Sequence, residues 1–301
     1  FSRIWFGADT DLDGHTLKAY LEMDLFGGAL GNEIATSTYG VTIRHAYVAW
    51  DKWLAGQTWS NFQDAAALPD AVDFVGPTEG TIFVRQAQLR YTNGPWSFSL
   101  ENPETTYAAH LTGARGASDD NSLPDLTLRY MHKASWGHFT VAGLARQLKY
   151  ETATSSESES AFALSVSGKW NVGANDDIRY MISGGSGLGR YLAFGLGPDA
   201  MTAADGSLEA LDGYGGFVAW RHAFSPKLRG NVFYSMAQFD NDPLLTGLAL
   251  TESARSFHAN LIYSPLPKID IGAELIWGNR ELESGADGDI RRLHMHVKYS
   301  F

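Results

Sequence analysis

Apolar and polar residues alternate along this chain in segments of about ten residues, and the last segment shows the pattern most clearly. There, every second residue is apolar: Leu293, Met295, Val297, Tyr299 and Phe301. The residues between them are polar: Arg292, His294, His296, Lys298 and Ser300. Successive side chains of a β-strand point to opposite faces, so this segment is predicted to be a strand with one apolar and one polar face.

The same alternation predicts about fifteen strands, most of them long enough to cross a lipid bilayer. We expect them near residues 2–9, 16–26, 41–50, 53–60, 81–92, 95–101, 123–133, 138–150, 161–172, 177–187, 211–224, 227–239, 252–264, 268–280 and 290–301. The connections alternate between short turns, such as Asn93-Gly94 and Ser225-Pro226, and long polar loops. The long loops lie near residues 103–121, 151–160, 188–210, 240–251 and 281–289.

Short turns on one side and long loops on the other are typical of outer-membrane barrels, whereas a soluble sandwich has no reason to sort its loops in this way. The sequence therefore predicts an all-β fold, with one transmembrane antiparallel β-barrel domain over residues 1–301. Bacterial barrels made of one chain have even strand numbers, so we expect 16 strands, the first of them missing from this chain. A barrel of this size leaves an aqueous lumen.

The composition narrows the functional classes. The net charge of −11 argues against a nucleic-acid partner, and the chain has no apolar run of the length that a membrane-spanning helix needs. No serine has an assignable histidine and acid, so we expect no enzyme and no catalytic residue; a hydrolase embedded in the barrel is the alternative of that class. His294 and His296 share one face of the last strand, but no third ligand can be named, so we expect neither a metal site nor a cofactor.

Residues 2–92 carry a more specific signal. They contain Leu54-Ala55-Gly56-Gln57-Thr58-Trp59-Ser60, then Leu68-Pro69, Asp73-Phe74 and Gly76-Pro77, and then Arg85-Gln86-Ala87-Gln88-Leu89-Arg90-Tyr91. This pattern resembles the DcaP-like outer-membrane porin family, and the final Phe301 resembles the end of the closing strand in outer-membrane barrels. The resemblance implies a homotrimeric porin of the bacterial outer membrane, surrounded by membrane lipid and lipopolysaccharide, for small anionic solutes such as dicarboxylates.

The loop of residues 61–80 is expected to fold into the lumen and to form the constriction of the channel. It carries four acidic residues and neither Lys nor Arg: Asp64, Asp70, Asp73 and Glu79. Its apolar residues, among them Phe62 and Val72, favour packing against an inner wall, because a loop free in solvent does not need them.

Strand parity places basic residues on the polar inner face, because an arginine that faces lipid at mid-depth costs about 2–4 kcal/mol. The pore-lining candidates are Arg3, Lys18, Arg44, Arg90, Arg129, Lys169, Arg179, Arg221, Arg229, Arg292 and Lys298. Arg85 has the opposite parity to Arg90 and is a candidate for a bulge or a trimer contact. Guanidinium groups bind carboxylates in a bidentate way, so a basic wall opposite an acidic loop predicts an anion-preferring channel for dicarboxylates.

Two other functions stay open. A general, weakly cation-preferring porin is expected if the inward arginines are paired with carboxylates, for which the candidates are Glu22, Asp24, Glu101, Asp125, Asp270 and Glu274. A structural or adhesive barrel is expected if the acidic outer loops bind a partner while the lumen is closed.

Overall fold

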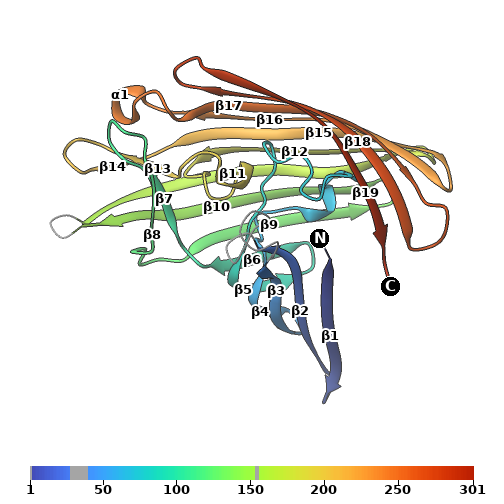
Figure 1. The fold of residues 1–301 in the computed structure, drawn as a ribbon. Helices are drawn as coiled ribbons and strands as arrows, with labels where there is room; N and C mark the ends of the chain where they lie inside the picture. Colours follow the sequence, from blue (N-terminus) through green and yellow to red (C-terminus); the bar gives the residue numbers. More distant parts are fainter. Residues whose placement is uncertain (1, 28–39, 153–155) are drawn as a thin grey trace.

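The structure is a computed structural model that describes residues 2–27, 40–152 and 156–301. Fifteen strands form one antiparallel sheet, in which each strand pairs with the next strand of the sheet along the chain (Figure 1). They are β1 (Arg3–Leu12), β2 (His15–Gly27), β3 (Gly40–Trp50), β4 (Trp53–Trp59), β5 (Arg85–Asn93), β6 (Trp96–Glu101), β9 (Asp125–Ala134), β10 (Gly137–Glu151), β11 (Ser156–Val172), β12 (Asp176–Ser186), β15 (Asp212–Ser225), β16 (Leu228–Asp240), β17 (Thr251–Tyr263), β18 (Ile269–Leu282) and β19 (Asp287–Tyr299). The fifteen strands predicted from the alternation are thus confirmed, although β5 begins at Arg85 and not near residue 81, and β11 begins at Ser156 and not near residue 161.

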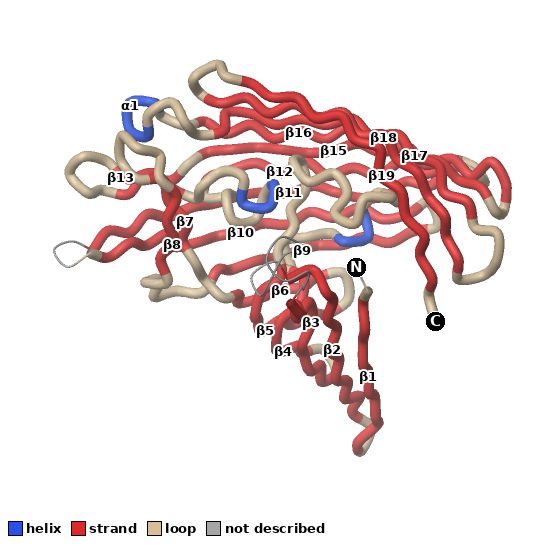
Figure 2. Tube along the Cα trace, viewed as in Figure 1, coloured by secondary structure: helices blue, strands red, loops and turns tan. Residues whose placement is uncertain are grey.

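The faces of this sheet are inverted relative to those of a soluble protein. On β18, the outward Leu275 and Trp277 are 46% and 41% exposed, whereas the inward Glu274 is fully buried. An apolar outer face and a polar inner face are what a barrel in a bilayer requires. Figure 2 shows the sheet curving, with loop segments crossing its concave side. β1 and β19 form its edges in the described part of the chain, and the sixteenth strand stays a prediction.

The connections have two lengths, as expected from the sequence. Turns of two to five residues join β1 to β2, β3 to β4, β5 to β6, β9 to β10, β11 to β12, β15 to β16 and β17 to β18. We call their side of the sheet the short-turn end and the opposite side the long-loop end. Within residues 2–27, 40–152 and 156–301, none of the helices has the length and hydropathy that a membrane crossing requires.

Two of the expected polar loops contain short strands that the sequence analysis missed. Four short strands, β7 (Thr105–Ala108), β8 (Arg115–Ser118), β13 (Ala200–Thr202) and β14 (Leu208–Ala210), form a second sheet in the order β14-β13-β7-β8. The expected loop at 151–160 is also shorter than predicted, because β11 begins at Ser156; residues 153–155 lie outside the described residues. The described residues also form three short helices: η2 (Ala65–Ala67), η3 (Ala193–Gly195) and α1 (Pro243–Thr246).

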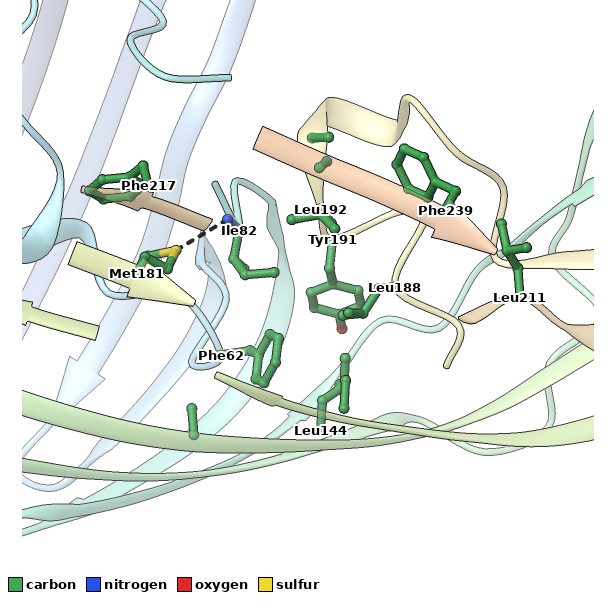
Figure 3. Packing of buried hydrophobic residues seen from close by; sticks show 14 of the residues in the cluster. Phe62, Ile82, Leu144, Met181, Leu188, Tyr191, Leu192, Leu211, Phe217 and Phe239 are labelled. Atoms are coloured by element: carbon green, nitrogen blue, oxygen red, sulfur yellow. Dashed lines mark hydrogen bonds between the residues drawn. The ribbon is translucent and has the colours of Figure 1, made fainter. Parts of the chain in front are cut away.

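The largest apolar cluster lies on the inner side of the sheet, where two long connections pack together. Phe62 and Ile82 come from the connection between β4 and β5, and Tyr191 and Leu192 come from the connection between β12 and β15 (Figure 3). All four are at most 1% exposed, and Ile82 also forms an isolated β-bridge with Leu192. Burial of such side chains contributes roughly 1.5–3 kcal/mol each, so the cluster fixes both connections inside the barrel.

Candidate functional site

The connection of residues 60–84 crosses the interior and is bound to the inner wall on opposite sides; we call it the infolded loop. At its start, the backbone N–H of Asn61 donates to Oε1 of Glu101 on β6 at 2.8 Å. Further along, the backbone N–H of Val72 donates to Oε2 of Glu274 on β18 at 2.7 Å. Since β6 and β18 are far apart in the strand order, the loop crosses the lumen, as the sequence analysis expected for residues 61–80. That this loop forms the constriction of the channel stays a prediction.

The end of the infolded loop lies directly on the wall. Glu79 Oε2 accepts a hydrogen bond from Ser256 Oγ at 2.8 Å, and the backbone N–H of Gly80 donates to Ser235 Oγ at 2.8 Å. A Cβ atom at Gly80 would lie 1.9 Å from the carbonyl oxygen of Gly216, which is far inside contact distance. Only glycine therefore permits this close approach of loop and strand.

The side chain of Asp64 attaches the infolded loop to β10 and β11 of the wall. Its Oδ2 lies 2.8 Å from Nε2 of His138 on β10 and accepts a hydrogen bond from Ser167 Oγ on β11 at 3.0 Å. Burial raises the pKa of the Asp64 carboxyl, but the contacts with His138 and Ser167 outweigh burial and hold this pKa below its ordinary value. Asp64 is therefore an ionised structural contact.

Asp70 and Asp73 also touch the wall directly. The Oδ2 of Asp70 lies 2.5 Å from Nε of Arg229, and the Oδ2 of Asp73 lies 3.4 Å from a terminal nitrogen of Arg292. The sequence analysis expected the acidic side chains of the loop to face a basic wall across an open lumen. The structure differs for Asp64, Asp70 and Asp73, because a carboxylate that folds into a lumen lined by cations gains most by direct contact.

A group of basic side chains gathers inside the barrel near the short-turn end, and we call it the short-turn cluster. Its five cations are Lys169, Arg179, Arg221, Arg229 and Lys298, and its three carboxylates are Asp70, Asp177 and Asp270. Arg179 lies 2.7 Å from Asp177, and Lys298 lies 2.7 Å from Asp270. The cluster keeps two more positive than negative groups, and its basic side chains are 18–56% exposed.

A second group lies near the long-loop end, and we call it the long-loop cluster: Arg3, Arg44, Arg85, Glu22 and Asp24. Arg44 is almost buried, with Nε 2.8 Å from Glu22 Oε1 and a terminal nitrogen 2.8 Å from Asp24 Oδ2. Arg3 also reaches Glu22, at 3.3 Å. Glu22 and Asp24 are therefore paired with Arg44 or Arg3.

Arg85 is the member of the long-loop cluster that the sequence analysis placed differently. Its guanidinium stacks on Trp59, 4.1 Å from the ring centroid, and lies 5.5 Å from the Phe83 ring. Among the described residues it makes no hydrogen bond or ion pair, and its Nε is buried without a partner. Arg85 faces a cavity of about 220 Å³, which is also lined by Asp24, Arg44, Phe26, Phe74 and Phe194.

The remaining predicted residues have different surroundings. Arg129 donates to the Gln63 carbonyl of the infolded loop at 3.1 Å, and Arg179 donates to the Leu68 carbonyl. Arg90 donates to Gln88 Oε1 at 2.8 Å and to the carbonyl of Trp59. Lys18 is exposed and makes no such contact with any residue that the structure describes.

Arg146 on β10 is a buried wall residue that the sequence analysis missed. Its Nε lies 3.1 Å from Asp125 Oδ2 and a terminal nitrogen lies 2.6 Å from Asp199 Oδ1, with all three side chains fully buried. Asp199 belongs to the connection between β12 and β15, so this triad attaches that connection to the wall. Arg146 lies on the same face of β10 as the apolar, inward Leu144 and Leu148, so that face was not recognised as polar. A single arginine in an otherwise apolar series could have indicated a buried ion pair.

Comparisons with known proteins place this geometry in a family. The model of the DcaP outer membrane protein family matches residues 10–301, whereas no curated protein sequence matches the chain. The structure is similar to the outer membrane channel DcaP of Acinetobacter baumannii, with a TM-score of 0.87 and 24% identity over 100% of this chain and 85% of that chain.

More distant porins share the fold. An anion-selective porin from Comamonas acidovorans gives a TM-score of 0.60 at 9% identity, over 99% of this chain and 89% of that chain. The trimer form of OmpT from Vibrio cholerae gives a TM-score of 0.60 at 12% identity, over 99% of this chain and 90% of that chain. Because the family model covers nearly the whole chain, the protein belongs to the DcaP outer membrane protein family and is a bacterial outer-membrane protein with the fold of a porin.

Proposed function

We propose that the protein is a passive channel for small anions, with a preference for dicarboxylates, and that it works as a homotrimer. The excess of cations over carboxylates in both lumen clusters is the observation that supports the proposal. Three arginines face two carboxylates in the long-loop cluster, and five cations face three carboxylates in the short-turn cluster. Selectivity follows the local field along the path, so this excess favours anions although the whole chain carries −11.

Arg85 is the best placed group to receive a carboxylate at the long-loop end. Its guanidinium is charged at every physiological pH and is not paired within the described residues. Trp59 and Phe83 hold it in place, so little side-chain entropy is lost when an anion binds. A solute that enters from the long loops meets this group before it passes the infolded loop.

The short-turn cluster offers several cations close together on the far side of the infolded loop. Arg179 and Arg221 both contact Asp177, at 2.7 and 3.5 Å, so their guanidinium groups lie side by side. The two carboxylates of one short solute can therefore bind to two cations at the same time. A solute with a single carboxylate forms only one of these contacts and binds more weakly. Because each cation also has a protein carboxylate nearby, the affinity stays modest and the solute can leave.

A general, weakly cation-preferring porin is the second candidate. The pairing of Arg44 with both Glu22 and Asp24 supports it, because those charges cancel. Two observations weigh against it: the surplus of cations in the short-turn cluster, and Arg85, which has no hydrogen-bond or ionic partner among the described residues. The structural or adhesive barrel has less support. A barrel whose lumen is closed to solutes does not need an infolded loop that is attached to the wall at so many points.

Block of single-channel current by succinate in a planar bilayer tests the dicarboxylate preference, with acetate as the monocarboxylate. Succinate is expected to block at much lower concentration than acetate. Arg85→Gln and Arg221→Gln should each raise the half-blocking succinate concentration roughly tenfold, since a hydrogen-bonded charge contributes about 1.5 kcal/mol or more. The matched control is Lys227→Gln, a change of the same charge in the turn between β15 and β16. Equal block by succinate and acetate would leave a general porin.

A further inference from the structure

Two arginines lie on the outer, membrane-facing surface of β17 and β19, beside a group of aromatic rings. Arg255 and Arg291 line one shallow depression of about 270 Å³ together with Tyr234, Phe257 and Trp277. The strand register brings these residues together, because Phe257 pairs with both Tyr234 and Trp277, and Trp277 pairs with Arg291. Each of the three rings is 41% exposed on the outer face.

These arginines differ from most basic residues of the lumen, because they have no partner among the described residues. Neither makes a hydrogen bond or an ion pair with a residue in the described ranges 2–27, 40–152 and 156–301. The acidic residue of the depression is Asp289, whose Oδ1 accepts a hydrogen bond from Asn279 at 3.0 Å. With two arginines and one aspartate, the depression is positive.

The height of the two arginines on the wall places them in the outer leaflet. Arg255 precedes Tyr263 by eight residues, and Arg291 precedes Tyr299, near the short-turn end, by the same number. Eight residues of strand rise roughly 26 Å along the strand, or about 20 Å along the barrel axis at the usual tilt. The backbone therefore lies in the upper part of an apolar band about 25 Å tall, and the long side chains reach the headgroup level.

We propose that this depression binds the phosphorylated headgroup of an outer-leaflet glycolipid, which in this membrane is lipopolysaccharide. Arg255 and Arg291 supply planar, permanently charged donors that match phosphate oxygens. Trp277 lies beside Arg291 in the strand register, and Phe257 lies two residues nearer the short-turn end than Arg255. Interfacial aromatic rings favour this level, where acyl chains leave the headgroup. An unpaired arginine at this depth is costly, and a lipid phosphate removes that cost.

Native mass spectrometry of the detergent-purified protein with diphosphoryl lipid A tests the site. Arg255→Gln and Arg291→Gln should each weaken binding roughly tenfold, in line with the loss of one charge-assisted contact. Lys227→Gln, at the opposite rim, should bind as the unchanged protein does. Lipid A without its phosphates should bind at least tenfold more weakly than the diphosphoryl form.

Three outcomes would overturn the proposal: equal binding of dephosphorylated lipid A, unchanged binding by both arginine variants, or displacement of the lipid by low concentrations of inorganic phosphate. If a glutamine variant fails to fold, Arg255→Lys and Arg291→Lys keep the charge but lose the bidentate geometry, and an intermediate loss is expected. Channel conductance should stay the same in all of these variants, so the result is independent of the solute that the lumen passes.

Discussion

The backbone N–H of Val72 donates a hydrogen bond of 2.7 Å to Oε2 of Glu274, although the two residues lie 202 positions apart in the chain. Glu274 is fully buried, and its other contacts are Asn260 Nδ2 at 2.9 Å and His258 Nδ1 at 2.8 Å. A buried carboxylate needs such partners, because without them its desolvation is not compensated. The infolded loop and the wall of β17 and β18 therefore stabilise each other.

Removal of the Glu274 side chain should detach the loop from this wall. Glu274→Ala leaves the Val72 N–H without its acceptor and is expected to lower the free energy of unfolding by about 1.5–3 kcal/mol, the value of a hydrogen bond to a charged group. Denaturant unfolding followed by tryptophan fluorescence measures the change, and single-channel conductance should rise. Glu252→Ala on β17 is the control, and a similar loss of stability there would contradict a specific role for Glu274.

Gly80 should tolerate no side chain. A Cβ atom at this position would meet the Gly216 carbonyl oxygen at 1.9 Å, so Gly80→Ala must move the loop or β15. We expect a loss of about 1–3 kcal/mol in the free energy of unfolding, as for an overpacked core, together with noisier channel currents. Gly288→Ala is the control, because nothing lies within 4 Å of a Cβ atom there. Equal effects of the two substitutions would show that the close contact does not matter.

Asp70 should reduce the anion preference of the short-turn cluster. Its Oδ2 lies 2.5 Å from Nε of Arg229 and 4.0 Å from Nε of Arg221. Asp70→Asn removes one negative charge, so the reversal potential under a salt gradient should shift toward chloride. Arg229→Gln should shift it in the opposite direction. Shifts in the same direction, or none, would mean that these residues lie outside the ion path.

Acid should weaken the contact of Asp64 with the wall. The pKa of Asp64 lies below its ordinary value of 3.8, because the contacts with His138 and Ser167 outweigh the effect of burial. A carboxyl group with a lowered pKa contributes stability above the pKa of the unfolded chain, and the contribution is lost as the pH falls through the pKa of the folded protein.

The measurement is the unfolding midpoint of the protein and of Asp64→Asn as a function of pH. The two proteins should differ near neutral pH, and the difference should shrink below about pH 4 and vanish at lower pH. A difference that persists at low pH would show that ionisation of Asp64 is not its cause.

The wall of this protein could be predicted from the sequence because each strand encodes its own two faces. Residues 291–301 show this, since the side chains of Leu293 and Val297 are exposed outside while Lys298 contacts Asp270 in the lumen. The infolding of residues 61–80 followed from apolar residues such as Phe62. The strands β7, β8, β13 and β14 were missed because three or four residues are too few to show an alternation.

The contacts within the candidate site could not be predicted, because they join residues far apart in the chain. The pairing of Asp64 with His138 spans 74 positions, and that of Asp70 with Arg229 spans 159. Parity assigned Arg229 to the lumen but could not tell which carboxylate it meets. Arg85 was placed differently because it is the first residue of β5, and the rule of alternate faces does not hold where the chain passes from the infolded loop into the strand.

The reversal potential of the reconstituted protein in a planar bilayer under a potassium chloride gradient tests the central claim most directly. The surplus of cations in both lumen clusters predicts a reversal potential with the sign of a chloride-preferring channel. Arg85→Gln and Arg221→Gln should each move this potential toward zero. A potential of the sign that potassium preference gives, unchanged by both substitutions, would contradict an anion channel.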